Sequence, residues 1–342
     1  MATVARLEAL KGIYCGDEVL LTNAIAHAEA SGDVEARSRA EYLYGTTLGR
    51  LGRYAAALEH LTLAIEIMEG RGDRWRQAMN MAQSARCYTA RAGRLEQSLI
   101  YAARARAEAE KLGDARLQAW CAMEAEPYMY MGLWDKAIEV ANKWLPVAWE
   151  ISEWPVVHWS SAWLAIACLK RKRPEQAKQI LDRVFAEVPA RALDNRSSFA
   201  IPYSHIAVAQ LHLETGHPNL ALNAAQQAVV SSRQTGAPLE EGAAHRVLGQ
   251  VYEAMGAPHA EADAAFRRSL ALLEAIESPP ELAQTLLAYG RFRRGDNSRQ
   301  DRALIERALR LFQEMGATGW VQEARAALNL PSGEPPNALD RT

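Results

Sequence analysis

The sequence has few cysteines, no long apolar run and no export signal. Its four cysteines, Cys15, Cys87, Cys121 and Cys168, are spread over 342 residues with spacings of 72, 34 and 47. These spacings suit neither a disulfide framework nor a zinc site, so a reducing, cytoplasmic setting is expected. No eighteen apolar residues run together, and the N-terminal MATVARLEAL carries charges where a signal peptide has its apolar centre. We therefore expect neither a membrane span nor export.

The charges of the chain nearly cancel. There are 39 Lys and Arg residues against 41 Asp and Glu residues, which gives a formal net charge of −2. Such a chain has no long-range field that would attract nucleic acid or an anionic membrane, so we expect neither as a direct partner. Hydrophobic residues make up 49% and charged residues 23%, proportions that are typical of a folded globular protein and exclude a disordered chain.

Motifs that would indicate catalysis or cofactor binding are also missing. The sequence contains no phosphate-binding glycine loop followed by Lys, no HExxH and no GxSxG. His205, His212 and His217 are spaced seven and five apart, which does not place all three on one face of a helix. We predict no catalytic residues, no cofactor and no metal site, and hence a protein that is not an enzyme.

What the sequence does contain is a repeat of about forty residues. Its clearest copy, AEYLYGTTLGRLGRYAAALEHLTLAIEIMEGRGD at residues 40–73, reads as two helices joined by a turn at Gly52. The equivalent positions in the second helices are spaced by 36 to 44 residues: Ala28, Ala64, Ala105, Trp144, Val184, Ala228, Ser269 and Ala308. Most turns between the two helices carry Gly, whereas Lys172 occupies one turn without it.

The local pattern predicts an all-α structure. Leu58, Leu61 and Ile65 recur at spacings of three and four, which gives a helix one apolar face. Gly-Asp pairs such as Gly72-Asp73 suit the end of one helix and the N-cap of the next. Since no segment shows strict alternation of apolar and polar residues, we predict essentially no strand. Stacked antiparallel helix pairs bury a continuous core, so the fold expected is an α-solenoid with about eight repeats.

The predicted array spans residues 1–328 and ends in a capping helix at 318–328. Two segments depart from the repeat. Residues 187–202 carry two prolines and coincide with the longest spacing, so we expect a long loop or a hinge there. The tail at 329–342 is expected to be disordered or a linker.

The repeats resemble the tetratricopeptide family. In HRVLGQVYEAMG, residues 245–256, Leu248-Gly249-x-x-Tyr252 matches the core of that family's first helix. The repeats are about forty residues long, whereas the family's usual repeat has 34. In this length they resemble a subgroup found in bacterial signalling proteins, including the maltose-regulon activator and the C-terminal arrays of class III nucleotide cyclases. The resemblance implies a right-handed superhelix that binds peptides or partner proteins in its concave groove.

In this family the first helix of each repeat lines the groove, which gives a candidate partner-binding set by register. The set comprises Arg39, Tyr42, Arg50, Asn80, Gln83, Arg91, Glu126, Tyr130, Trp159, Tyr203, Gln210, Arg246 and Gln250. Across all inward positions we count seven cations and three carboxylates: Arg39, Arg50, Arg91, Lys170, Arg246, Arg291 and Arg294 against Glu126, Glu214 and Glu253. An acidic or carboxylate-bearing partner is favoured, because Arg grips a carboxylate with two hydrogen bonds. The alternative is that these charges only solvate long helices.

Tryptophan is concentrated in one part of the chain. Seven of the nine tryptophans lie within about forty residues: Trp120, Trp134, Trp144, Trp149, Trp154, Trp159 and Trp163. Aromatic residues are frequent in binding hot spots, so this region is a candidate contact surface or a patch for self-association into a homo-oligomer. The alternative is that most of them pack in the core, as positions Trp134 and Trp144 in the repeat suggest.

Two functions are consistent with these observations. The first is a non-catalytic sensing or interaction segment of a larger bacterial signalling or transcription regulator. The second is a free-standing adaptor that scaffolds two partner proteins.

Overall fold

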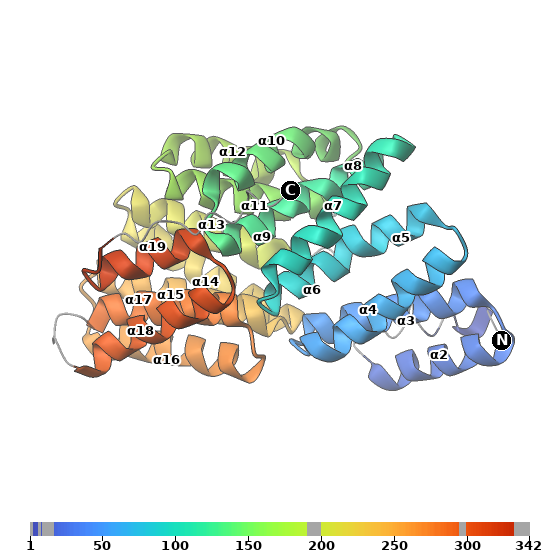
Figure 1. Ribbon diagram of the computed structural model, residues 1–342. Coiled ribbons are helices and arrows are strands. Elements are labelled where there is room, and N and C mark those ends of the chain that lie inside the picture. Colours follow the sequence, from blue (N-terminus) through green and yellow to red (C-terminus); the bar gives the residue numbers. More distant parts are fainter. Residues whose placement is uncertain (1–2, 6–7, 9–16, 190–199, 294–298, 332–342) are drawn as a thin grey trace.

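The computed structural model describes residues 3–5, 8, 17–189, 200–293 and 299–331, and within these ranges the chain forms helices and no strand (Figure 1). The all-α prediction is therefore confirmed. Consecutive helices pack in pairs along the chain, as expected for an α-solenoid. None of the helices in these ranges is long and apolar enough to cross a membrane.

Within the described residues, seven repeats have both a first and a second helix and the first repeat contributes a second helix, with bounds as follows. The first helices are α3 (Val34–Arg50), α5 (Arg74–Asn80) continued by η1 (Met81–Ala85) and α6 (Arg86–Arg91), α8 (Ala115–Cys121) continued by η2 (Ala122–Glu124) and α9 (Ala125–Met131), α11 (Trp154–Lys170), α13 (Ile201–Glu214), α15 (Pro238–Ala254) and α17 (Pro279–Arg293). The second helices are α2 (Glu18–Ser31), α4 (Tyr54–Gly70), α7 (Leu95–Leu112), α10 (Trp134–Glu150), α12 (Pro174–Glu187), α14 (Pro218–Thr235), α16 (His259–Ala275) and α18 (Arg299–Glu314), and α19 (Thr318–Ala327) follows as the final helix.

The repeat register read from the sequence matches this structure. Each of the eight equivalent residues from Ala28 to Ala308 lies in a second helix. Seven of them are named among the buried apolar residues, and Ser269 is fully buried as well. Small residues at this position let each second helix approach its neighbours closely, while Trp144 fills the same place with a large ring. The extra C-terminal helix is also present, as α19.

The turns follow the local chemistry of the sequence. Asp33, Asp73 and Asp114 each accept a hydrogen bond from a backbone N–H in the first turn of the next helix. Lys172 adopts the left-handed conformation, with φ of 57°, at the turn where the sequence offers no glycine. The helix ends are therefore encoded locally even where a turn carries an unfavourable residue.

The array closes on itself, which the sequence analysis did not anticipate. In Figure 1, α17 and α19 lie beside the first helices of the third and fourth repeats. Ser278 donates a hydrogen bond to the backbone carbonyl of Arg91 over 3.0 Å, and the indole N–H of Trp320 donates to the carbonyl of Met129 over 3.0 Å. These contacts join residues 187 and 191 positions apart, so the groove expected from the sequence becomes a partly enclosed interior.

Three turn glycines pack closely against residues near the C-terminal end of the array. A side chain on Gly52 would collide with Ile276, and one on Gly93 would press on Met315. The backbone of Gly319 lies directly against Gly132. The turns of repeats two, three and four thus contact the segments before α17 and α19 and the first turn of α19.

Two sequence expectations concern segments that the structure describes only in part. Most of the expected hinge at 187–202 lies outside the described residues, because 190–199 are not among them. The same holds for 332–342 of the expected tail. The division into an array at 1–328 and a tail therefore stays a prediction.

Candidate functional site

The partly enclosed interior contains a large cavity of about 580 Å³. It is lined by α3, by the α5–α6 and α8–η2 segments, and by the N-terminal ends of α11 and α15. Methionine and tryptophan side chains form much of its apolar wall: Met68, Met79, Met123, Trp75, Trp120 and Trp159. Cavities of this size and composition are typical of ligand-binding sites.

A hydrogen-bonded group of polar residues forms another part of the wall. The Tyr42 hydroxyl donates to the side-chain carbonyl of Gln83 over 2.5 Å and accepts a hydrogen bond from Ser84 at 3.2 Å. The hydroxyls of Ser84 and Thr46 are 3.1 Å apart. Gln83 and Ser84 belong to η1, a π-helical turn inside an otherwise α-helical segment. Such turns are often found at functional sites because they re-aim side chains.

Arginine dominates the charge of the large cavity. Five arginines line it against three glutamates. Arg76 pairs with Glu35 at 2.8 Å, and Arg116 pairs with Glu153 at 3.0 Å. The exposed Arg39 has no ion-pair or hydrogen-bond partner within the described ranges. The cavity therefore presents more positive than negative charge to a ligand.

Two tryptophans that line the large cavity have indole N–H groups without a hydrogen-bond acceptor among the described residues. The indole nitrogens of Trp120 and Trp159 are buried and have no hydrogen-bond partner among the residues the structure describes. A buried N–H without an acceptor costs free energy, since it has lost its water without a replacement. Both groups could donate to an acceptor on a ligand that enters the cavity.

A buried ionic cluster adjoins the large cavity, because two of its members, Arg91 and Glu240, line that cavity. Glu126 accepts hydrogen bonds from Arg86 at 3.0 Å and from Arg91 at 3.1 Å, and Arg91 also pairs with Glu240 at 3.1 Å. All four residues are almost fully buried. Burial by itself would raise the pKa of Glu126, but Arg91 and Arg86 hold that pKa below its ordinary value. The carboxylate is therefore charged at neutral pH and fixes both guanidinium groups.

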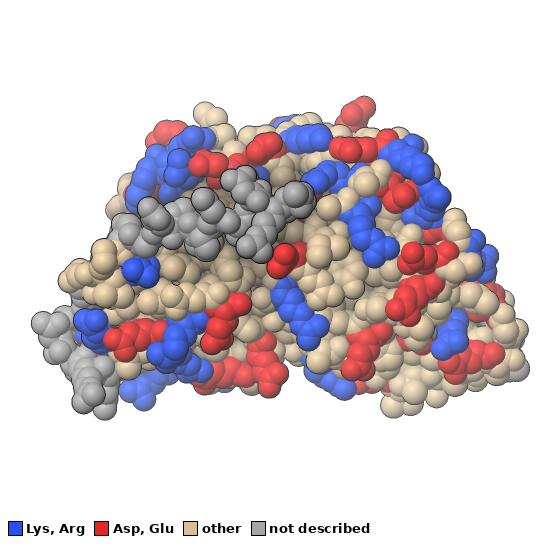
Figure 2. All heavy atoms as spheres, viewed as in Figure 1, with Lys and Arg blue, Asp and Glu red and all other residues tan. Residues whose placement is uncertain are grey.

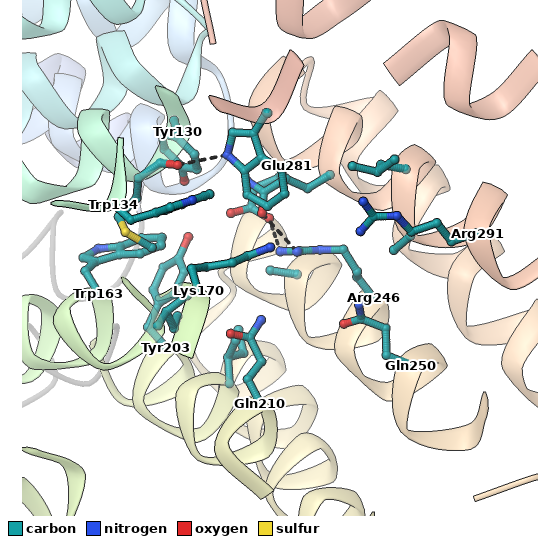
Figure 3. A pocket seen from close by; sticks show the side chains of 18 residues that line it. Tyr130, Trp134, Trp163, Lys170, Tyr203, Gln210, Arg246, Gln250, Glu281 and Arg291 are labelled. Atoms are coloured by element: carbon teal, nitrogen blue, oxygen red, sulfur yellow. Dashed lines mark hydrogen bonds and ion pairs between the residues drawn. The ribbon is translucent and has the colours of Figure 1, made fainter. Parts of the chain in front are cut away.

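The second, smaller cavity of about 80 Å³ lies among α9, α11, α13, α15, α17 and α19 (Figure 3). Tyr130, Trp163 and Tyr203 form one aromatic side of it, and their rings contact one another with centroids 4.5 to 5.8 Å apart. Lys170 and Arg246 extend into it from opposite sides in Figure 3. The segments that meet here come from the middle and the end of the chain, so this cavity exists because the array closes.

The residues predicted from the sequence divide between the two cavities. Those at the large cavity are Arg39, Tyr42, Arg50, Asn80, Gln83, Arg91 and Trp159, and those at the small cavity are Tyr130, Tyr203, Gln210, Arg246 and Gln250. Glu126 differs, because it lines neither cavity and is fully buried between Arg86 and Arg91. Glu126 thus forms buried ion pairs with both arginines, and its contact with a partner stays a prediction.

Two carboxylates that sequence reasoning missed are Glu240 and Glu281. Glu240 lines the large cavity, while Glu281 lines the small one and accepts a hydrogen bond from Arg246 at 2.5 Å. Each is the third residue of a first helix that begins with Pro, and the two positions are 41 residues apart. A comparison of helix starts between repeats could have found them. They offset part of the positive charge that the register had predicted.

The tryptophans divide between packing and cavity lining. Trp144 is buried in the core without lining either cavity, whereas Trp120 and Trp159 line the large cavity and Trp134 and Trp163 line the small one. Trp149 and Trp154 form a T-shaped pair outside both cavities. On the outer face viewed in Figure 2, cationic and anionic side chains are interspersed.

Comparison with known proteins gives matches among solved structures alone. No protein-family model matches the chain, and no curated protein matches it. A crystal structure of a Rap protein complexed with competence and sporulation factor is 13% identical, with a TM-score of 0.66, and the match covers 96% of this chain and 92% of that one. This likeness shows the fold. The chain is a helical array of the same architecture.

Two further solved structures share this architecture. NprR in complex with its cognate peptide NprX is 13% identical, with a TM-score of 0.62 and coverage of 96% of this chain and 95% of that chain. Aspartyl phosphate phosphatase F from Bacillus subtilis is also 13% identical, with a TM-score of 0.56 and coverage of 87% and 76%. The fold thus occurs in one protein bound to a peptide, in one bound to a factor and in one named as a phosphatase.

Proposed function

We propose that this chain is a non-catalytic receptor for a short acidic peptide, which binds in the large cavity, and that it serves as the sensing segment of a signalling regulator. The observation that carries this proposal is the arginine excess inside a partly enclosed cavity of about 580 Å³. Arginines accompanied by unpaired indole N–H groups suit a ligand that brings several acceptors, as a peptide with carboxylate side chains does. Two of the similar structures, named above, were solved with a peptide or factor bound.

The chemistry of the cavity wall supports binding rather than catalysis. Its lining includes no histidine among the described residues. Burial raises the pKa of the Cys87 thiol to about 12, so this thiol is not a nucleophile at neutral pH. Glu35 and Glu153 are held by arginines and are not free to act as general bases.

The position of the large cavity explains how ligand binding would affect the conformation of the whole array. The large cavity is lined by α3 near the start of the array and by the first turn of α15, which lies some two hundred residues later. A ligand that contacts both would stabilise the closed form of the array over a more open one. Differential binding of this kind is what shifts a conformational equilibrium.

The proposal is tested with a synthetic library of hexapeptides, divided into acidic and basic pools, in a fluorescence polarisation assay with the full chain. We expect acidic peptides to bind. The double variant Arg39→Glu with Arg50→Glu should weaken the best acidic peptide at least a hundredfold, because it turns two attractive charges into repulsive ones.

A matched control keeps the charge change but moves it away from the cavity. Arg94 and Arg310 are exposed and line neither cavity. Arg94→Glu with Arg310→Glu should therefore leave the affinity within about twofold. Equal losses in the two double variants, or selection of basic peptides by the wild type, would overturn the proposal.

A further inference from the structure

More positively than negatively charged residues line the small cavity. Three cations line it, Lys170, Arg246 and Arg291, against the single carboxylate of Glu281. Glu323 of α19 lies next to it and serves two of these cations, with Lys170 at 3.1 Å and Arg291 at 3.4 Å. Even with Glu323 included, three cations face two carboxylates. This group runs from the buried Arg246 to the exposed Arg291, and one of its positive charges is not balanced by a carboxylate among the residues that the structure describes.

The ammonium group of Lys170 is held in place by aromatic rings. Its nitrogen lies 4.3 Å from the ring centre of Trp320 and 5.4 Å from that of Trp134. The two rings are themselves packed edge to face. Burial lowers the pKa of Lys170, Glu323 raises it, and Arg291 and Arg246 lower it further. A bound anion would favour the charged ammonium, so this position gains from negative charge.

Hydrogen-bond donors at the small cavity also lack acceptors. The hydroxyls of Tyr130 and Tyr203 and the Nε–H of Arg246 have no partner among the described residues. Figure 3 shows the Tyr203 hydroxyl directed toward the space between Trp134 and Lys170. A carboxylate has two oxygens that accept about four hydrogen bonds, so it suits a group of donors of this kind.

We propose that the small cavity is a binding site for one carboxylate group, supplied by a small monocarboxylic acid. The single unbalanced charge favours a monoanion over a phosphate dianion. A space of about 80 Å³ takes a group of carboxylate size, and Ile166, Ile206 and Leu287 provide apolar walls for a short carbon chain. This site does not depend on the proposed peptide site, because no residue lines both cavities.

Binding there would strengthen the closure of the array. Lys170 belongs to α11, whereas Arg246 and Arg291 belong to α15 and α17. A carboxylate between them adds a charged contact between the middle and the end of the chain. The acid is therefore expected to raise the thermal midpoint of unfolding of the whole array.

The test is a titration of the full chain with sodium acetate and sodium pyruvate, followed by calorimetry and by the thermal midpoint of unfolding, with sodium chloride at matched ionic strength. We expect one equivalent of acid to bind and the midpoint to rise. Lys170→Met and Arg291→Gln should each weaken binding at least tenfold. Each variant leaves Glu323 paired with the remaining cation, so circular dichroism should show an intact fold.

Arg116→Gln, which removes one cation from the large cavity, is the matched control and should bind acetate like the wild type. Unchanged acetate affinity in both Lys170→Met and Arg291→Gln would overturn the proposal, as would an equal effect of chloride or inorganic phosphate.

A competition experiment between acetate and an acidic hexapeptide shows whether the carboxylate bound in the small cavity comes from a free acid or from the peptide. If the two exclude each other, the carboxylate belongs to the peptide and the separate small-molecule site is wrong. If peptide binding fails while acetate binds, the peptide proposal alone falls.

Discussion

Gly319 and Gly132 pack backbone against backbone across the closure of the array. A Cβ atom on Gly319 would lie 2.2 Å from the carbonyl oxygen of Gly132, far inside van der Waals contact. Trp320, the next residue, donates its indole N–H to the carbonyl of Met129 on the same segment. The contact between the last helix and the fourth repeat therefore depends on the absence of a side chain at position 319.

The substitution Gly319→Ala tests this contact. We expect it to cost about 1 to 3 kcal/mol of unfolding free energy, because an extra methyl in a filled contact forces the backbones apart. Urea unfolding measures the loss. Gly70→Ala is the control, since a Cβ atom there meets nothing within 4 Å. It should leave stability unchanged or raise it slightly. A Gly319→Ala variant as stable as Gly70→Ala would contradict the closure.

The ion pairs of Glu126 give a second prediction. Glu126→Gln leaves Arg86 and Arg91 facing a neutral amide in a fully buried place. Breaking a buried pair in this way typically costs about 3 to 5 kcal/mol, and we expect the lower part of that range because Glu240 still serves Arg91. Chemical denaturation gives the value. The exposed Glu139 provides the control, and Glu139→Gln should change stability by less than about 0.5 kcal/mol.

A pH dependence follows from His158. Its ring is buried beside the Ser204 hydroxyl at 3.0 Å, and burial together with His205 lowers its pKa to about 4. The unfolded chain binds this proton near its ordinary pKa of about 6.5, so falling pH favours unfolding between about 6.5 and 4. The contribution reaches about 3 kcal/mol at the lower limit.

The measurement compares the wild type with His158→Asn over this pH range. Above pH 7 the difference in unfolding free energy should be constant. It should then shift in favour of the variant as the pH falls toward 4, since Asn takes up no proton. A difference that stays constant from pH 7 to 4 would show that His158 does not carry the effect.

The indole N–H of Trp159 is expected to contact the peptide. Trp159→Phe keeps an aromatic ring in the wall of the large cavity and removes the donor. We expect about a tenfold loss of affinity for the acidic peptide, which corresponds to one hydrogen bond to a charged acceptor. Trp149→Phe, outside both cavities, should bind as the wild type does. A loss that is the same in both variants would place the contact elsewhere.

Much of the local structure could be predicted from the sequence. The apolar spacing around Leu61 and Ile65 gives a helix with one buried face, and both residues are buried in α4. The Asp73 cap and the turn at Gly52 are set by the same few residues that form them. Such features depend on interactions within one or two turns of chain, which is why a single sequence is enough to predict them.

Most of the candidate residues that the repeat register assigns to inward positions line one of the two cavities, since the first helices do line the interior. Glu126 lines neither cavity, because the register gives the direction of a side chain and not its partner. Arg86 and Arg91 lie on α6 while Glu126 lies on α9, and their pairing depends on how two repeats stack. The neutralising roles of Glu240 and Glu281 were missed for the same reason.

By itself, the sequence determined the helix pairs, their register, their caps and the final helix, since each arises from contacts between neighbours in the chain. The tertiary structure alone decided that the array closes, that the interior splits into two cavities, and that Glu323 reaches Lys170 across 153 residues. Closure depends on rotations that accumulate over several repeats, and no local pattern contains that sum.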